Sequence, residues 1–326
     1  MTLLLYDEIF LKHDTGAFHP ENYKRLEHTL AHLKTTGLWD RLKVEKPRPA
    51  TLEEIAQVHG EDYINRVMLI SQRGEGQLDP DTPVSYHSYK AALYAAGAPL
   101  TAIDAIMEGK ATNAFCLVRP PGHHARPNRG MGFCLFNNVA IAAQYLLNKH
   151  NLKRVAIVDW DCHHGNGTQE IFYEEPRVLY LSLHRWPFYP GTGDKKETGI
   201  GKGEGFTINI PLSGNTSSEE YIRTFKEVME GKVKDFRPEF IIISAGFDTY
   251  SGDPIAGLGL EPEDFRRLTE ITLGVASSPE ANKRVVSCLE GGYNLQALPL
   301  CIEQHLLGLL GSNPLPLDGG GQGEGD

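Results

Sequence analysis

The segment 158–167, VDWDCHHGNG, places acidic and imidazole side chains directly after an apolar run. Asp161 and His163 are two positions apart, so in extended backbone they point to the same side and can contact one cation. Asp248 follows another apolar run, in the motif SAGFD. Acids at strand ends also cap loops, but a third ligand in a second segment favours a metal. One imidazole and two carboxylates form a borderline site for Zn²⁺ with a position open for water, so these residues predict a catalytic metal site.

Two adjacent histidines, His123 and His124, follow the rigid segment 119–122, RPPG, and predict proton transfer. An imidazole changes charge near neutral pH, and each ring needs a partner on its far nitrogen. Asp159 and Asn166 remain for these partners, one for each ring. A carboxylate favours the imidazolium and an amide does not, so we expect the two histidines to differ in proton affinity.

The segment 290–294, EGGYN, ends the last apolar run. Its glycines allow the backbone to approach a ligand closely. The phenol of Tyr293 can donate a hydrogen bond to an oxygen that gains negative charge, although a tyrosine that packs at a helix start is the alternative. His164 has no contact with metal or substrate in this scheme, and we expect it to support the structure.

Apolar runs rich in β-formers predict the strands that position these residues. They lie at 3–7, 113–118, 154–160, 178–184, 206–212, 240–247 and 285–292, with a weaker run at 41–47. Helical spacing of apolar residues occurs within 21–37, 51–69, 88–109, 137–151 and 217–236. The alternation predicts an α/β protein with an open, mainly parallel sheet of about eight strands and helices on both faces. Because the carboxyl ends of such strands share one edge, the polar clusters should meet there.

Two details predict where helices begin and end. Gly37 is a plausible C-cap of the helix within 21–37. Thr51 followed by Glu54 is a capping-box pattern at the start of the helix within 51–69.

Composition limits the partners and the compartment. The chain has 326 residues and a formal charge of −10, which argues against nucleic acid as the main partner and is compatible with a cationic substrate. No signal peptide and no apolar run of membrane-spanning length occurs, and the five widely spaced cysteines include no CxxC. We therefore expect a cytoplasmic protein without a membrane partner, with one catalytic domain at 1–312 and a disordered Gly-rich tail at 313–326.

The motifs RPPGHHA, GFCLFNN, DWDCHHGNGTQ, YPGTGD, SAGFD and EGGYN occur in this order. In these motifs the sequence resembles the histone deacetylase family, and in particular its class II members and the bacterial histone deacetylase-like amidohydrolases. The resemblance implies the arginase–deacetylase fold, Zn²⁺ on Asp161, His163 and Asp248, and a catalytic role for Tyr293. It pairs His123 with Asp159 and His124 with Asn166, where class I enzymes have Asp.

The resemblance also implies a tunnel for an acyl-lysine side chain. Phe133 and Tyr189 should form its walls, with Gly132 and Gly292 lining it. Most family members have Phe at both wall positions, so the Tyr189 hydroxyl changes the polarity of the tunnel. Asp81 aligns with a rim residue that holds the substrate backbone. Polyamine-specific relatives carry Glu at the position of Ile255, which offers no charge here.

Further implied positions lie behind the tunnel. Arg25 matches an arginine of an inner cavity, and K⁺ is expected near Asp159, Asp161, His163, Ser182 and Leu183. The predicted reaction is hydrolysis of an N-acyl amide, with N6-acetyl-lysine in peptides or proteins as the main substrate. Alternatives are a deacylase of acetylpolyamines, other small amides or longer acyl-lysines, an arginase-like two-Mn²⁺ hydrolase, and a non-catalytic module that binds acyl-lysine. The sequence predicts no oligomeric state.

Overall fold

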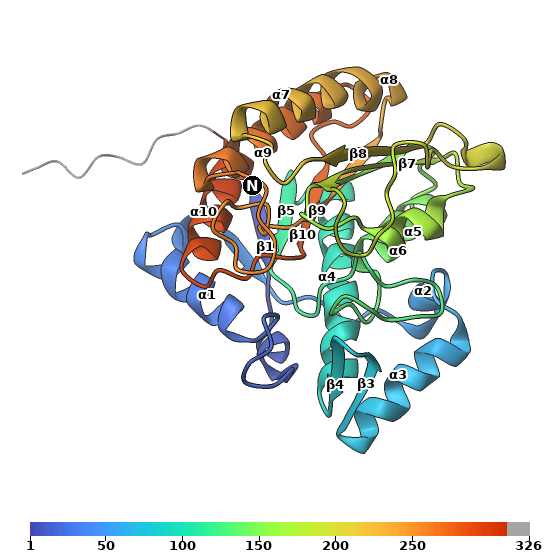
Figure 1. Cartoon of the computed structure of the whole chain (residues 1–326), viewed down its shortest axis with the longest axis vertical. Coiled ribbons are helices and arrows are strands. Elements are labelled where there is room, and N and C mark those ends of the chain that lie inside the picture. The colour runs from blue at the N-terminus through green and yellow to red at the C-terminus, as the bar shows by residue number, and fades with distance from the viewer. Residues whose placement is uncertain (312–326) are drawn as a thin grey trace, which may run out of the picture.

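An eight-stranded parallel sheet lies at the centre of the structure (Figure 1). The computed structural model describes residues 1–311. In order across the sheet the strands are β2 (Lys43–Glu45), β1 (Thr2–Leu5), β5 (Asn113–Cys116), β10 (Val285–Leu289), β9 (Phe240–Ala245), β6 (Val155–Asp159), β7 (Val178–Arg185) and β8 (Thr207–Leu212). The predicted fold class is confirmed. The predicted tail at 313–326 lies outside the described residues, and the single domain at 1–312 stays a prediction.

The four central strands explain why the sequence shows continuous apolar runs. Every residue of β5, β10, β9 and β6 is buried. Parallel strands covered on both faces have no solvent-facing positions and therefore do not alternate between polar and apolar residues. At the edge, β2 is partly exposed, which accounts for the weak signal of KVE.

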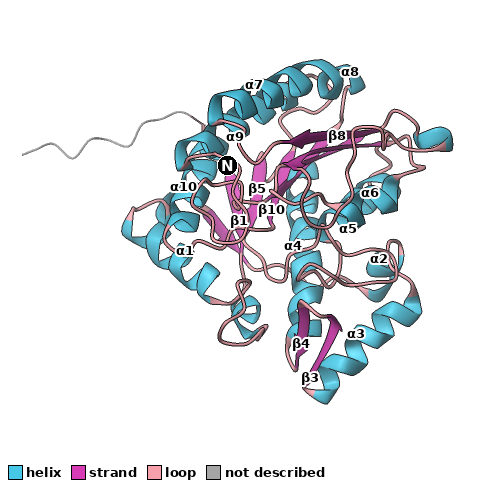
Figure 2. Ribbon diagram, viewed as in Figure 1, coloured by secondary structure: helices cyan, strands magenta, loops and turns pink. Residues whose placement is uncertain are grey.

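Helices cover both faces of the sheet (Figure 2). On one face α4 (Ser88–Met107) packs against β1, β5 and β10, and α5 (Asn138–Asn148) packs against β6 and β9. A second group of helices packs together and comprises α1 (Lys24–Thr35), α7 (Ser218–Val228), α9 (Pro262–Ala276) and α10 (Ala297–Leu310). Of these helices, α10 contacts the strand β5. Within residues 1–311 no helix combines the length and apolar character that a membrane span requires.

The predicted helix at 51–69 is wrong as a single element. The Thr51–Glu54 capping box is present, but α2 covers only Leu52–Ala56, and α3 begins again at Glu61 and runs to Arg73. Between them the Gly60 amide donates to the Pro127 carbonyl at 3.1 Å, and the His59 ring accepts from the Asn137 amide at 2.9 Å. The Gly60 contact replaces a helical hydrogen bond, whereas the His59 amide still donates to the Ile55 carbonyl.

Other predicted helices differ in smaller ways. α1 ends before Gly37, whose φ of 70° is left-handed, as a glycine after a helix allows. The helix within 217–236 is divided into α7, a π-helical turn at Met229–Val233 and α8 (Lys234–Phe236). The remaining short helix that precedes β7 is α6 (Asn166–Phe172).

Besides α6, the strands β3 (Glu75–Asp79) and β4 (Thr82–Ser85) and the helices α9 and α10 were not among the expected elements. The hairpin of β3 and β4 is antiparallel and separate from the main sheet. The helix α10 is apolar on most sides, so it lacks the single apolar stripe that marks an amphipathic helix. The helix α9 begins with Pro262 at its first turn and a box formed by Glu261 and Asp264.

The sheet order brings the polar clusters together. The segments RPPGHHA, EGGYN, SAGFD and DCHHGNG follow β5, β10, β9 and β6, which are four neighbouring strands. Because these strands are parallel, the segments leave the sheet at the same edge. The convergence predicted from the sequence is confirmed.

Candidate active site

Asp161, His163 and Asp248 form one buried cluster at this edge. One ligand atom from each residue lies within 4.8 Å of the others. His163 Nδ1 is 3.0 Å from Asp161 Oδ1 and 2.9 Å from Asp248 Oδ2. These are the three residues that the sequence predicts as metal ligands.

Backbone contacts around this cluster are consistent with a cation. Asp248 Oδ1 accepts from the Cys162 amide at 2.8 Å, whereas Asp248 Oδ2 is buried and has no hydrogen bond of good geometry. A Cβ atom at Gly291 would lie 2.5 Å from Asp248 Oδ2 and 2.6 Å from Asp161 Oδ2, so only glycine leaves the carboxylates room. Two carboxylates and one imidazole suit a borderline divalent cation, and the residues therefore fit a metal.

The charges in the cluster are strongly coupled. Burial alone would lower the pKa of His163, but its hydrogen bond to Asp161 and the close carboxylate of Asp248 outweigh burial and raise this pKa to about 10. Burial and the nearby Asp161 raise the pKa of Asp248 to about 7. The two carboxylates thus attract positive charge to the point between them, which a divalent cation supplies in exchange for a proton.

The tandem histidines lie beside the cluster with different partners. His123 Nδ1 is 3.0 Å from Asp159 Oδ2, and His124 Nδ1 is 2.8 Å from Asn166 Oδ1. The two rings are 4.0 Å apart between centroids. This is the pairing that the family resemblance implies.

The different partners separate the proton affinities of the two rings. Burial lowers the pKa of His123, but the carboxylates of Asp159, Asp161 and Glu290 outweigh it and raise it to about 10. Burial, with His123 and His163 nearby, holds the pKa of His124 well below its usual range. At neutral pH His123 is therefore charged and His124 is neutral, as expected for a carboxylate and an amide partner.

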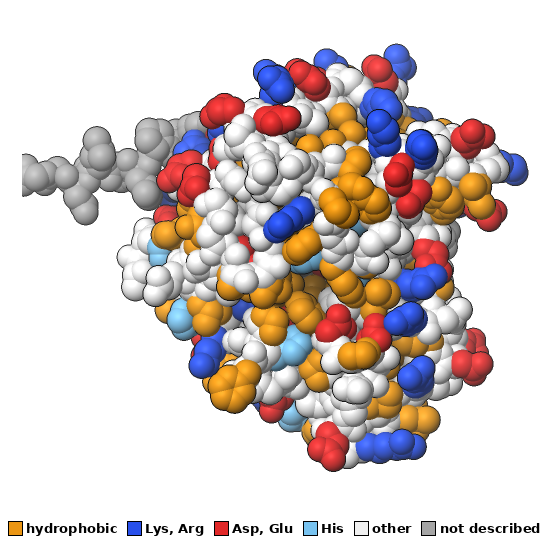
Figure 3. All heavy atoms as spheres, viewed as in Figure 1, with side chains coloured by type: hydrophobic (Ala, Val, Ile, Leu, Met, Phe, Trp, Pro, Cys, Tyr) orange, Lys and Arg blue, Asp and Glu red, His pale blue; other side chains and the backbone are white. Residues whose placement is uncertain are grey.

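A narrow cavity of about 170 Å³ leads to these groups. It is lined by Asp81, His124, Gly132, Phe133, His163, Tyr189, Ile255 and Tyr293. Figure 3 shows hydrophobic side chains gathered around a hollow near the middle of one face of the molecule. Five of the six predicted substrate-binding residues thus line one cavity, whereas Gly292, the sequence neighbour of Tyr293, is not among its lining residues.

The cavity walls are fixed by their neighbours. The Phe133 ring packs edge-on against Tyr293 at 5.8 Å, and Asp81 Oδ1 accepts from the Gly132 amide at 3.2 Å. Tyr189 lies edge-on to His124 at 5.2 Å, and burial raises the pKa of its hydroxyl far above the usual range. Phe188, which the sequence analysis did not single out, stacks on the His163 ring at 5.2 Å.

Glu290 is a second residue that the sequence did not reveal as part of the site. Its buried carboxylate accepts from the Gly122 amide at 2.7 Å and from the His123 amide at 3.1 Å through Oε2. Oε1 accepts from the Ser244 hydroxyl at 3.1 Å. It therefore holds the backbone of the tandem histidines against two neighbouring strands. Only the position of Glu290 at a strand end could have suggested this.

The other predicted residues have structural contacts. His164 is buried between Thr192 Oγ1 at 2.7 Å and Gln169 Oε1 at 2.9 Å, as a supporting residue would be. The sheet register pairs Asp159 with Ser182, whose hydroxyl is 2.9 Å from His184 Nδ1, and Leu183 is buried. The K⁺ site at these residues stays a prediction.

A buried network of charged side chains contacts the segment that precedes Tyr293. The Glu21 carboxylate pairs with Arg119, at 2.8 Å from Nη2 to Oε2, and with Arg25, at 3.2 Å. Arg25 in turn donates to the carbonyls of Glu290 at 2.6 Å and Gly292 at 2.7 Å. The three charged side chains are fully buried. Arg25 therefore contacts the segment that precedes Tyr293, and its place in an inner cavity behind the metal stays a prediction.

Glu21→Gln should lower the free energy of unfolding by roughly 3 kcal/mol or more, because it leaves buried guanidinium groups without their counter-charge. Burial opposes the charge of Glu21, but Arg119 and Arg25 lower its pKa to about 2. The stabilisation is therefore present at neutral pH and is lost as the pH falls towards 2. Chemical denaturation measures the free energy of unfolding of each variant. The control is Glu270→Gln, which removes the charge of an exposed ion pair with Arg266 and should lower the free energy of unfolding by less than about 1 kcal/mol. An equal loss in both variants would contradict this role.

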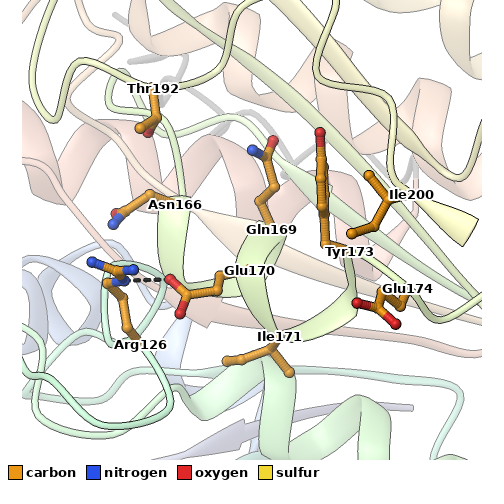
Figure 4. Close-up of a pocket in the computed structure, with 9 residues that line it drawn as sticks. All are labelled: Arg126, Asn166, Gln169, Glu170, Ile171, Tyr173, Glu174, Thr192 and Ile200. Carbon is orange, nitrogen blue, oxygen red and sulfur yellow. Dashed lines mark hydrogen bonds and ion pairs between the residues drawn. The ribbon is translucent and has the colours of Figure 1, made fainter. Parts of the chain in front are cut away.

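A second cavity, of about 620 Å³, has Asn166 among its lining residues (Figure 4). It is lined by Arg126, Asn166, Gln169, Glu170, Ile171, Tyr173, Glu174, Thr192 and Ile200, and an ion pair joins Arg126 to Glu170. Its lining includes neither Tyr293 nor any residue of the cluster of Asp161, His163 and Asp248. The predicted site residues His124, His163 and Tyr293 line the smaller cavity instead.

The sheet order and its polar edge place this protein in the arginase–deacetylase fold class. The model of the histone deacetylase domain matches residues 19–309, and the chain belongs to the histone deacetylase family. This is a family of deacetylases and amidohydrolases, as the resemblance implies.

Relatives with similar sequences come from distant organisms. A probable deacetylase of Archaeoglobus fulgidus is 42% identical over 92% of this chain and 83% of its own. A histone deacetylase-like amidohydrolase of Pseudomonas aeruginosa is 38% identical over 86% of this chain and 73% of its own. The crystal structure of the HDA15 HD domain has a TM-score of 0.90 at 38% identity and covers 97% of this chain and 90% of that domain.

Proposed function

We propose that this protein is a zinc-dependent deacylase that hydrolyses N-acyl amides, with N6-acetyl-lysine in peptides or proteins as its main substrate. The observation that carries the proposal is the small cavity that His124, His163 and Tyr293 line together. Its volume of about 170 Å³ is below the roughly 300–1,000 Å³ of sites for drug-sized ligands, so it suits a slender chain such as that of lysine.

Asp161, His163 and Asp248 are the proposed zinc ligands. When bound there, Zn²⁺ supplies a Lewis acid that polarises the acyl carbonyl and makes water acidic enough to attack near neutral pH. The support for this assignment is that one ligand atom of each residue lies within 4.8 Å of the others and that the buried Asp248 Oδ2 has no hydrogen-bond partner.

The other polar groups of the site have separate proposed roles. Tyr293 donates a hydrogen bond to the carbonyl oxygen as it gains negative charge. His124 is neutral and accepts a proton from the attacking water, and His123 is held as an imidazolium by Asp159. The C–N bond then breaks, and the leaving amine takes a proton from His124 or His123.

The walls of the cavity bear on the choice of acyl group. Phe133 offers an apolar ring, whereas Tyr189, which also lines the cavity, adds a hydroxyl and is 38% exposed. Ile255 at the rim carries no charge and therefore gives no contact to a distal ammonium group. These contacts favour acetyl-lysine over acetylpolyamines.

A panel of acyl substrates with zinc-loaded protein tests the proposal. We expect the highest kcat/KM on an acetyl-lysine peptide, lower values on acetylspermidine and on longer acyl-lysines, and inhibition by a hydroxamate. Higher kcat/KM on acetylspermidine would favour the small-molecule deacylase. Bound zinc without turnover on any acyl substrate would favour an acyl-lysine binding module.

A further inference from the structure

Contacts from outside its own segment determine where Tyr293 lies. Gly291 and Gly292 precede it, and Gly292 has a φ of 119°, so the backbone there has few conformational limits of its own. The Tyr293 amide donates to Asp253 Oδ2 at 2.7 Å. The neighbouring Asn294 side chain donates to the Gly252 carbonyl at 2.9 Å. The loop after β9 therefore holds the backbone of the tyrosine.

The same carboxylate also holds the rim of the cavity. Asp253 Oδ1 accepts from the Ile255 amide at 3.0 Å and from the Ala256 amide at 3.1 Å. The loop closes where the Gly257 amide donates to the carbonyl of Asp248 at 2.8 Å. The Asp253 side chain thus connects the rim at Ile255 to Tyr293, and the backbone bond from Gly257 joins the same loop to Asp248.

We propose that Asp253 is a positioning residue that aims the Tyr293 hydroxyl at the acyl carbonyl and fixes the rim at Ile255. This inference rests on the proposed deacylase function. A hydrogen bond from an amide to a carboxylate is stronger than one between neutral groups, so Asp253 restrains Tyr293 more firmly than a neutral side chain could. A displacement of about 1 Å at a catalytic group can lower a rate 100-fold, which makes such a restraint important.

Asp253→Asn separates the two contacts. An asparagine that keeps its oxygen towards the Ile255 and Ala256 amides presents an NH₂ group to the Tyr293 amide, and two donors repel each other. We expect kcat to fall by roughly 10-fold or more, but by no more than it falls when the Tyr293 hydroxyl is removed. KM should change little.

Glu239→Gln is the matched control. Its carboxylate also accepts from two backbone amides, those of Lys153 at 2.6 Å and Arg154 at 2.9 Å, but it lies at the opposite end of the sheet. We expect its kcat and KM to equal those of the parent protein. A kcat loss equal to that of Asp253→Asn would overturn the proposal.

A double variant distinguishes positioning from general damage. If Asp253 acts through the Tyr293 hydroxyl, Asp253→Asn should change kcat by less than about twofold when Tyr293→Phe is already present. The same fold loss in both backgrounds would show that Asp253 does not act through this hydroxyl.

Hydrogen exchange tests the contact without any turnover. In Asp253→Asn we expect the Tyr293 amide to exchange roughly 10-fold faster or more, the scale of one lost hydrogen bond to a charged group, while amides of β9 keep their rates. Unchanged exchange at Tyr293 would overturn the proposal. If the parent protein hydrolyses no acyl substrate, the deacylase function fails, and this measurement still decides whether Asp253 holds the tyrosine.

Discussion

Asp248→Asn is expected to abolish zinc binding and turnover together. The substitution keeps the shape of the side chain, and its oxygen can still accept from the Cys162 amide at the position of Oδ1. The amide nitrogen then replaces Oδ2, the buried atom that faces His163, and an amide nitrogen is not a metal ligand. Zinc affinity should fall by more than about 100-fold. Removal of a residue that only hydrogen-bonds to a metal ligand lowers affinity by about 10–100-fold, and loss of a ligand itself should cost more.

Metal analysis after dialysis and a deacetylation assay measure the two effects in the same sample. Because several kcal/mol of stabilisation come from a catalytic metal, we expect turnover to fall by about 10³-fold or more. Asp264→Asn is the control, since Asp264 is also buried but accepts from Ser218 and Glu261. Normal zinc content and activity in Asp248→Asn would show that the metal, if present, lies elsewhere.

The strands, and the sheet edge where the polar segments meet, were predictable from the sequence because buried positions are occupied by apolar residue types. A strand covered on both faces, such as Phe240–Ala245, must be apolar throughout, and the first polar residues after it mark the sheet edge. Asp161, His163 and Asp248 follow such runs, which is why their proximity could be inferred. The residues alone did not decide whether Asp159 or Asn166 contacts His123; the family resemblance did.

Contacts that depend on loop conformation were not predictable. Glu290 and His123 are 167 positions apart, and no spacing rule links a strand-end glutamate to a particular backbone amide. The same holds for Glu21, which lies 98 positions from Arg119. The helix break at Gly60 has a similar cause, because its amide donates to the distant Pro127 carbonyl and this tertiary contact outweighs local helix propensity.

Tyr293→Phe should lower kcat by roughly 10²–10³-fold with zinc retained, the loss expected for one donor to a developing oxyanion. The ring contacts remain, since Phe133 packs on this ring at 5.8 Å and the Arg25 guanidinium lies 5.1 Å from its centre. Burial and the nearby Asp248 hold the pKa of the Tyr293 hydroxyl well above its usual range. The hydroxyl therefore keeps its proton and can donate at neutral and mildly alkaline pH.

The affinity of the Tyr293→Phe variant for an acetyl-lysine peptide separates catalysis from binding. The hydroxyl contact strengthens as the carbonyl oxygen gains charge, so its loss should lower kcat much more than it weakens ground-state binding. We expect a Kd within a few-fold of the parent value, measured with zinc-loaded protein. Full turnover by this variant would exclude Tyr293 as the donor. A large loss of affinity with unchanged kcat would make it a binding residue of the cavity instead.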